Sequence, residues 1–221
     1  MYYILQYRYI YTKITLDLLT GGYIMNIVVH LMFAVTVRRR VKKTLGVSLN
    51  LPGFLYGNIL PDISRKYGAY PHYMRDALMH VVDSKDNLLS QSSQDALSTY
   101  GFAREIGAIN HYLSDFFCLP HTEEFIGGKL KHGLYELGMI TRYKKGLRAW
   151  RGMLIKNCGV LSPDDIKAFI LNNSDVYKNK KASRVKDIGY ALFAGSKLLE
   201  SMITYSESLA NTVKYPVLSA V

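Results

Sequence analysis

Residues 109–121 read Ile-Asn-His-Tyr-Leu-Ser-Asp-Phe-Phe-Cys-Leu-Pro-His and combine a helical pattern with three groups that can bind a metal ion. His111 and Asp115 are four residues apart, so a helix presents both side chains on one face. Pro120 is expected to end this helix, because proline removes a backbone donor and clashes with the preceding turn. His121 follows the proline directly. The stretch therefore predicts a helix that delivers imidazole and carboxylate groups to a junction.

The same helical period extends outward from this stretch. Apolar residues recur at three- and four-residue spacing at Ala96, Tyr100, Ala103, Ile106, Ile109, Leu113 and Phe116. Two more helices are expected over 130–147 and 188–209, and Ser162-Pro163-Asp164-Asp165 is typical of a helix start. The six prolines lie at junctions between such segments, whereas alternating strand patterns and hairpin turns are absent from the sequence. We therefore predict an all-α fold with a single multi-helical domain.

Length and composition limit the classes of protein that this chain can represent. With 221 residues, one compact domain is expected. Hydrophobic residues make up 49% and charged residues 20%, which excludes a disordered or collagen-like chain. Cys118 and Cys158 are the only cysteines, so neither a disulfide framework nor a cysteine-rich zinc finger organises the fold. The net charge of +11 favours anionic partners such as lipid headgroups, phosphates or nucleic acid.

Residues 1–24 differ from the rest of the chain. They are rich in tyrosine but lack the continuous apolar core and the small-residue cleavage site of a secretion signal. Thr20-Gly21-Gly22 can be encoded by codons that contain AGGAGG, a bacterial ribosome-binding sequence. We therefore expect residues 1–24 to be a leader read as protein or a disordered extension, with a domain over 25–221 that starts at Met25. The absence of a clear signal predicts a cytoplasmic location.

A second pair of potential ligands follows the first. His132 and Glu136 repeat the four-residue spacing on the next expected helix. Two antiparallel helices joined near His121 would gather both pairs in one space between them. Imidazole and carboxylate ligands suit zinc, and sites that keep an open position for water are catalytic. One His–acid pair at this spacing is more often a stabilising pair on a helix surface, so the prediction depends on the whole set.

Three further residues belong to the candidate set. Asp62 follows a proline in a turn, where an ordinary turn or capping role is the alternative. His72 follows a second proline ten residues later, and His30 lies in an apolar stretch where a hydrogen-bonded core histidine is the alternative. His80 lies eight residues after His72 and could replace it as a ligand if the register after the second proline differs.

In this order, the candidate residues resemble the ligand set of the bacterial zinc-dependent phospholipase C family, which shares a superfamily with fungal zinc-dependent single-strand nucleases. The resemblance extends from about Met25 to Glu136. It rests on His30, Asp62, His72, His111, Asp115, His121, His132 and Glu136. It implies a helical domain that holds a trinuclear centre of Zn²⁺ ions.

The resemblance also implies which residues hold each ion. One zinc ion would be held by Asp62, His72, His111 and Asp115, with Asp115 bridging to a second. His121, His132 and Glu136 would hold another. The third would be completed by His30 together with the amine and carbonyl of the mature N-terminal residue. We assign that role to Met25, which stands five residues before His30.

Clustered zinc ions suit phosphodiester hydrolysis, because zinc activates water and stabilises the leaving alkoxide. The resemblance implies a phospholipase C that acts on glycerophospholipids, with Asp62 orienting or deprotonating the attacking water. Basic clusters over 38–43, 144–151 and 178–186 fit an anionic membrane surface and equally fit a nucleic-acid backbone. A single-strand nuclease and a non-catalytic, zinc-binding, membrane-associated protein are therefore the alternatives.

Overall fold

The computed structural model describes residues 24–91 and 95–214, with side chains over 27–91 and 96–208, so all of the expected leader except Ile24 lies outside it. The elements are α2 (Ile24–Leu45), α3 (Leu51–Gly57), α4 (Leu60–Ile63), α5 (Met74–Ser90), η1 (Asp95–Ser98), α6 (Tyr100–Asp115), η2 (Leu119–His121), α7 (Lys129–Lys156), η3 (Pro163–Asp165), α8 (Ile166–Lys178) and α9 (Arg184–Lys214). No strand occurs in the described ranges, and the prediction of an all-α fold is confirmed. None of these helices combines the length and apolar composition that crossing a membrane requires.

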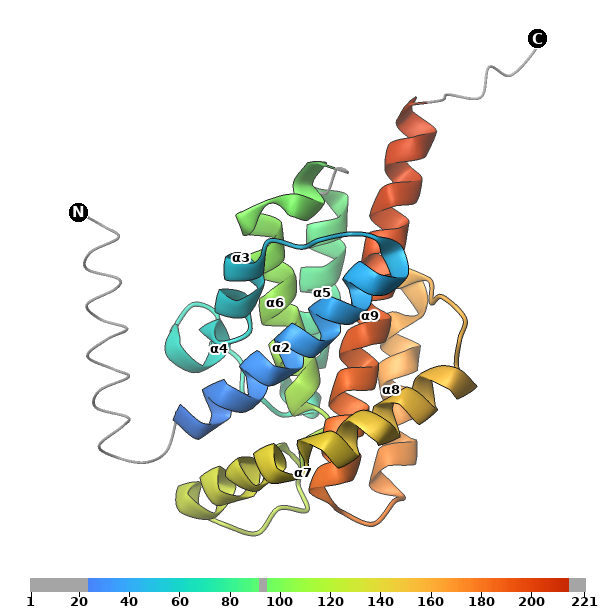
Figure 1. Cartoon of the computed structure of the whole chain (residues 1–221). Coiled ribbons are helices and arrows are strands. Elements are labelled where there is room, and N and C mark those ends of the chain that lie inside the picture. Colours follow the sequence, from blue (N-terminus) through green and yellow to red (C-terminus); the bar gives the residue numbers. More distant parts are fainter. Residues whose placement is uncertain (1–23, 92–94, 215–221) are drawn as a thin grey trace.

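Helix α9 forms the centre of the fold (Figure 1). Every residue from 187 to 203 is buried, so protein surrounds the helix along that length. Its side chains share one hydrophobic core with residues of α2, α6 and α7, which pack against it. Those three helices carry most of the predicted metal ligands. The core therefore determines where the ligand-bearing helices lie.

Capping explains where the predicted helices begin. At the start of α6, Thr99 Oγ1 accepts a hydrogen bond from Phe102 N at 3.2 Å. The helix therefore begins at Tyr100, whereas Ala96 lies in the 3₁₀ turn η1 that precedes the cap. Ser162 acts as the expected cap, but the turn that it begins is η3, which leads into α8. Helices α7 and α9 both extend beyond the ranges expected from the sequence.

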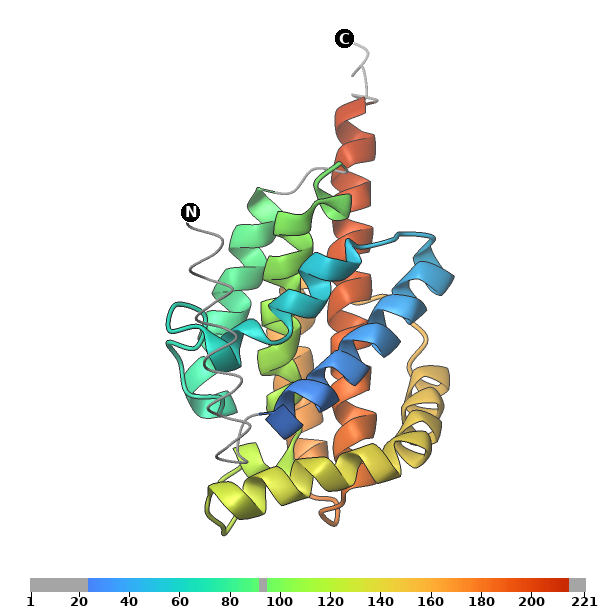
Figure 2. The ribbon, with the colours of Figure 1, turned by 60° about the vertical axis from the view of Figure 1, so that its left-hand side comes forward.

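Helices α6 and α7 are not an antiparallel pair, so that expectation is wrong. Figures 1 and 2 show α7 crossing beneath the C-terminal end of α6. Helix α7 packs mainly against α9 and α2. The direction of α7 follows from its apolar face, on which Met139 and Trp150 are buried in the core. His132 and Glu136 still come close to the end of α6, because they lie near the start of α7.

Two glycines allow α3 to approach α6 closely. A Cβ added to Gly107 of α6 would lie 2.6 Å from a backbone oxygen of α3 and 3.0 Å from Gly57 Cα. Asn58 follows Gly57 directly, and its carbonyl contacts the ring of His111. Helix α4, which carries Asp62, comes next along the chain. The glycine contact therefore sets the distance of Asn58 and Asp62 from α6.

We expect Gly107→Ala to lower the free energy of unfolding by about 1–3 kcal/mol, because the added methyl group must push α3 away from α6. Gly152→Ala is the matched control, since a Cβ at this α7 position would meet nothing within 4 Å. An unobstructed helical Gly→Ala change stabilises a helix by roughly 0.5–1 kcal/mol. Denaturant titration measures both changes. Equal stability of the two variants would contradict the role given to this contact.

Candidate metal centre

The structure brings together every predicted ligand whose side chain it describes. These side chains form four overlapping groups, and the ligand atoms of each group lie within 4.8 Å of one another. The groups are His30, His111 and Asp115; Asp62, His72 and His111; His72, Asp115 and His121; and His121, His132 and Glu136. The ligand candidates thus come from α2, α4, α6, η2, α7 and the loop before α5, yet they meet in one cluster.

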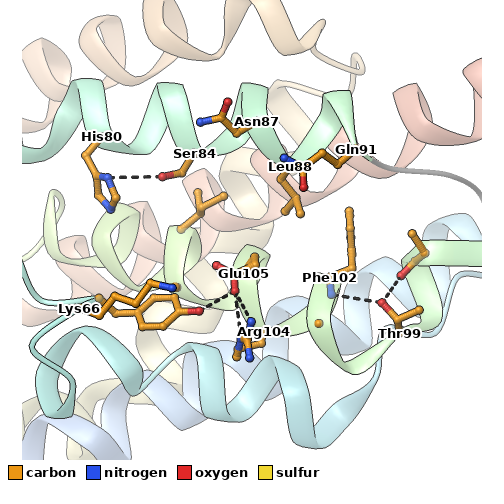
Figure 3. Close-up of a pocket in the computed structure, with 15 residues that line it drawn as sticks. Lys66, His80, Ser84, Asn87, Leu88, Gln91, Thr99, Phe102, Arg104 and Glu105 are labelled. Atoms are coloured by element: carbon orange, nitrogen blue, oxygen red, sulfur yellow. Dashed lines mark hydrogen bonds and ion pairs between the residues drawn. The ribbon is translucent and has the colours of Figure 1, made fainter.

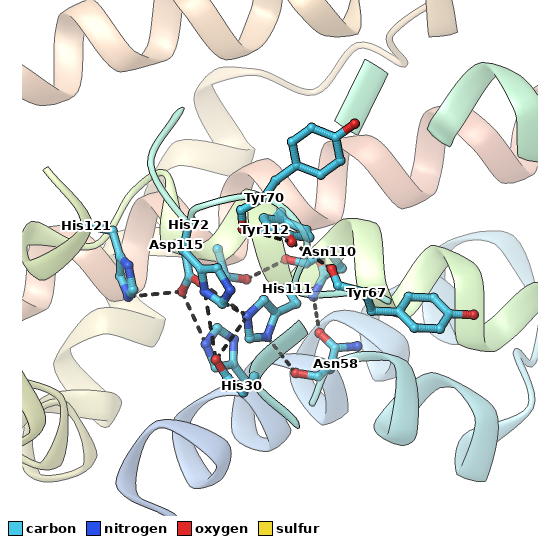
Figure 4. Close-up of polar contacts among 12 residues, drawn as sticks. His30, Asn58, Tyr67, Tyr70, His72, Asn110, His111, Tyr112, Asp115 and His121 are labelled. Atoms are coloured by element: carbon cyan, nitrogen blue, oxygen red, sulfur yellow. Dashed lines mark hydrogen bonds and ion pairs between the residues drawn. The ribbon is translucent and has the colours of Figure 1, made fainter. Parts of the chain in front are cut away.

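The carboxylate of Asp115 lies in the middle of this cluster (Figure 4). Its Oδ1 is 3.2 Å from His30 Nε2 and 3.5 Å from His121 Nε2. Its Oδ2 is 2.8 Å from His72 Nδ1 and 3.2 Å from His111 Nε2. One carboxylate therefore faces four imidazoles, two on each oxygen. This arrangement suits a carboxylate that bridges two metal ions.

Contacts on the far side of the ring orient His111. Its Nδ1 donates a hydrogen bond to Asn58 O at 2.8 Å, which leaves Nε2 to face the carboxylates. Asn58 is itself fully buried, and its Oδ1 accepts a hydrogen bond from Asn110 Nδ2 at 2.7 Å. A histidine that binds a metal through one nitrogen usually donates with the other. His111 is therefore held in the tautomer that metal binding requires.

A second part of the cluster lies where η2 meets α7. Glu136 Oε1 is 2.9 Å from His132 Nε2 and 3.5 Å from His121 Nε2. The rings of His121 and His132 meet edge to face, with centroids 4.7 Å apart. Because His121 also faces Asp115, it joins this part of the cluster to the first.

The carboxylates of the cluster require compensating positive charge. Burial opposes protonation of His111, but the charges of Asp62 and Asp115 outweigh burial and raise its pKa to about 9. Burial alone would raise the pKa of the Asp115 carboxyl. The surrounding imidazoles, His121 foremost, instead hold this pKa well below its ordinary value. Protons on the imidazoles or bound cations can supply the missing charge.

Unpaired buried atoms indicate that a cation fits here. Within the described part of the chain, His30 Nδ1 and Glu136 Oε2 are buried and have no hydrogen-bond partner. His121 Nε2 also lacks a hydrogen-bond partner, although two carboxylates lie 3.5 Å away. Buried polar atoms without partners are costly, and coordination by Zn²⁺ would satisfy nitrogen and oxygen atoms of this kind. The donor set therefore fits zinc.

The cluster is covered on most sides and open on one. The side chains of His111, Asp115 and Asp62 are 0%, 2% and 4% exposed. Those of His72 and His132 are 18% and 29% exposed. The cluster is therefore accessible from the side where His72 and His132 lie.

His80 does not belong to the cluster. Its ring stacks on Tyr70 with centroids 4.3 Å apart, and its Nδ1 lies 3.4 Å from Ser84 Oγ. It lines a separate hollow of about 590 Å³ between α5 and α6 (Figure 3). His72, and not His80, thus reaches the cluster. Met25 lies in the first turn of α2, but its side chain is outside the described residues, so its role stays a prediction.

One residue that positions the cluster was not predicted from the sequence. Asp187 is fully buried on α9, and its Oδ2 accepts hydrogen bonds from Leu119 N at 3.0 Å and Tyr135 Oη at 2.8 Å. Leu119 begins η2, which contains His121, and Tyr135 adjoins Glu136 on α7. Asp187 therefore ties both segments to the central helix. In the sequence, Asp187 is recognisable only as an acid beside a long apolar segment. This pattern does not show which residues donate hydrogen bonds to it.

The fold and the cluster define a helical metalloprotein in which five imidazoles and three carboxylates form a candidate zinc centre. A family model described as zinc-dependent phospholipase C matches residues 29–184, and the chain belongs to this family. The match extends past Glu136, where the specific sequence resemblance ended, to the first residue of α9. No curated protein and no solved structure matches the chain.

The cluster predicts a measurable zinc content. We expect His111→Ala to lose at least one zinc ion, because His111 belongs to two of the four ligand groups. His80→Ala is the matched control and should keep the zinc content of the parent protein. Elemental analysis of the purified proteins measures both, and chelation should lower the melting temperature of the parent. Equal zinc content in the two variants would overturn the proposed centre.

Asp187→Leu should destabilise the fold and weaken metal binding near His121, because Leu119 N and Tyr135 Oη lose their acceptor. Each buried donor left unpaired costs about 1–3 kcal/mol. Tyr177→Phe is the control, since Tyr177 Oη donates only to Asp187 Oδ1, at 2.8 Å.

Tyr177→Phe should lower the stability without a comparable loss of metal affinity. Asp187→Asn should be more stable than Asp187→Leu and should bind metal more tightly, because the amide oxygen can still accept a hydrogen bond. Titration with Co²⁺ followed by visible absorption measures affinity separately from unfolding. Unchanged Co²⁺ affinity in Asp187→Leu would contradict the positioning role.

Proposed function

We propose that this protein is a phospholipase C that hydrolyses glycerophospholipids with the help of three zinc ions. The observation that carries the proposal is the position of Asp62 within the cluster. Asp62 Oδ1 lies 3.6 Å from His111 Nε2 and 3.8 Å from His72 Nδ1. The Asp62 carboxylate is thus nearly buried beside a ligand candidate on the open side, where a phosphodiester would enter. Membership of the zinc-dependent phospholipase C family supports the reaction type.

The short distances support a division of the cluster among three ions. Asp62, His72, His111 and Asp115 would hold one, and His121, His132 and Glu136 would hold another. His30 would hold the third together with the backbone of Met25. Asp115 would bridge two of the ions, since both of its oxygens face imidazoles.

Bound zinc would polarise the phosphoryl group and make a water molecule acidic near neutral pH. Asp62 accepts the proton of this water and orients it toward phosphorus. The water oxygen bonds to phosphorus as the bond from phosphorus to the glycerol oxygen breaks, and the glycerol oxygen takes a proton from solvent. The products are diacylglycerol and a phosphorylated headgroup. Burial of Asp115 and His111 excludes bulk water from the inner side of the cluster.

We expect Asp62→Asn to lower phosphatidylcholine hydrolysis by roughly two to four orders of magnitude, because a positioned base contributes about that much. Asp175→Asn is the matched control, since Asp175 is exposed on α8 and should leave activity unchanged. Zinc content is measured alongside, so that loss of the base can be separated from loss of an ion.

Parallel assays on phosphatidylcholine and single-stranded DNA test the substrate class. Lipid hydrolysis that depends on zinc and on Asp62 is the expected result. Cleavage of DNA without cleavage of lipid would replace the proposal by the nuclease alternative. Full zinc content with no turnover of either substrate would identify a non-catalytic zinc protein.

A further inference from the structure

Helix α7 has an exposed apolar face opposite its two ligand candidates. Leu130, Leu134 and Leu137 recur at helical spacing and are 72%, 52% and 41% exposed. Ile126, just before the helix, is 85% exposed, and its carbonyl accepts a hydrogen bond from Lys131 Nζ at 2.7 Å. We refer to Ile126, Leu130, Leu134 and Leu137 as the α7 stripe. Apolar side chains gathered in one exposed place mark an interaction site, whereas scattered ones do not.

Every exposed charge on α7 is positive. The exposed bases are Lys129, Lys131, Arg142, Lys144, Lys145, Arg148, Arg151 and Lys156. The one acid of the helix, Glu136, is buried in the metal cluster. Leu130, Leu134 and Leu137 share the outer face of the helix with Lys145 and Arg148, which follow at helical spacing. This combination is typical of a helix that lies in a membrane interface.

We infer that the α7 stripe and the bases around it dock the protein onto an anionic lipid surface. Figure 2 shows α7 along the lower edge of the molecule, with its N-terminal part, which carries the stripe, at one end of that edge. A second copy of the chain is a poor occupant, because two such faces would bring like charges together. The exposed acids nearest to the stripe in sequence are Glu123 and Glu124, and Glu123 is paired with Arg75 at 2.8 Å. The charges on α7 favour an anionic partner, and the choice of a lipid as that partner rests on the proposed function.

Docking on this face keeps the metal cluster close to the lipid. His132 and Glu136 project from the opposite side of α7, so about one helix diameter, roughly 10 Å, separates the cluster from the docked face. A headgroup lifted from the bilayer would pass the N-terminal end of α7 and reach His132 on the open side of the cluster.

The main test compares vesicle binding by two variants of the full chain. The stripe variant carries Leu130→Ser, Leu134→Ser and Leu137→Ser. The control is Leu171→Ser on α8, which is 41% exposed. Co-sedimentation uses phosphatidylcholine vesicles with and without phosphatidylglycerol. The parent and control should bind the anionic vesicles alike, and the stripe variant should bind at least about tenfold more weakly. Omitting phosphatidylglycerol should weaken binding of the parent.

A fluorescence measurement reports contact with lipid directly. The chain has one tryptophan, Trp150, which is 7% exposed and donates a hydrogen bond to Ser196. Leu134→Trp adds a tryptophan to the stripe, and its emission should shift to the blue when anionic vesicles are added. Leu171→Trp, on α8, should show no shift. Equal responses from the two positions would overturn the inference.

Turnover separates this inference from the proposed function. The stripe variant should hydrolyse a short-chain, monomeric phosphatidylcholine as fast as the parent does. A parent that binds vesicles through the stripe but hydrolyses no phospholipid would refute the proposed function alone. Full turnover with undiminished vesicle binding by the stripe variant would refute the docking surface alone. A parent dimer that the stripe variant converts to a monomer would assign the stripe to a second copy and overturn the inference.

Discussion

One buried carboxylate, that of Asp115, must face four imidazoles at once, and the arrangement of the surrounding segments follows from this requirement. His30 reaches it from α2, His72 from the loop before α5, His111 from one turn earlier on α6, and His121 from η2. Each segment must therefore approach the C-terminal end of α6. The charge of Asp115 is tolerated away from water only because these rings, or the cations that they would hold, surround it.

Helix α7 has two different tasks on its two sides. Its inner side contributes His132 and Glu136 to the cluster and Met139 to the core. Its outer side contributes to neither the cluster nor the core. That side carries exposed leucines and basic residues, and the helix has no exposed acid. Core packing and the ligand cluster account for the inner side, whereas the lipid docking that we infer would account for the outer side.

The sequence allowed the all-α fold and the order of the candidate ligands to be predicted, because both depend on local spacing. His111 with Asp115 and His132 with Glu136 each share a helix face whatever the rest of the chain does. The relation between α6 and α7 was not predictable in this way. It depends on how Met139 and Trp150 pack into the core around α9, which no local pattern reports. Asp187 was missed for a similar reason, since its hydrogen-bond partners lie more than fifty residues away, apart from Tyr177.

The burial of Asp187 within α9 has a consequence for how the protein matures during synthesis. The candidate ligands lie between Met25 and Glu136, so a ribosome completes all of them before it reaches α9. In η2, however, Leu119 N donates its hydrogen bond to Asp187 of α9. Helices α2, α6 and α7 also pack against α9 in the common core. A nascent chain would therefore expose its imidazoles and carboxylates as separate, unassembled groups. The cluster therefore takes its final geometry only when α9 has packed against the helices that carry most of its ligands.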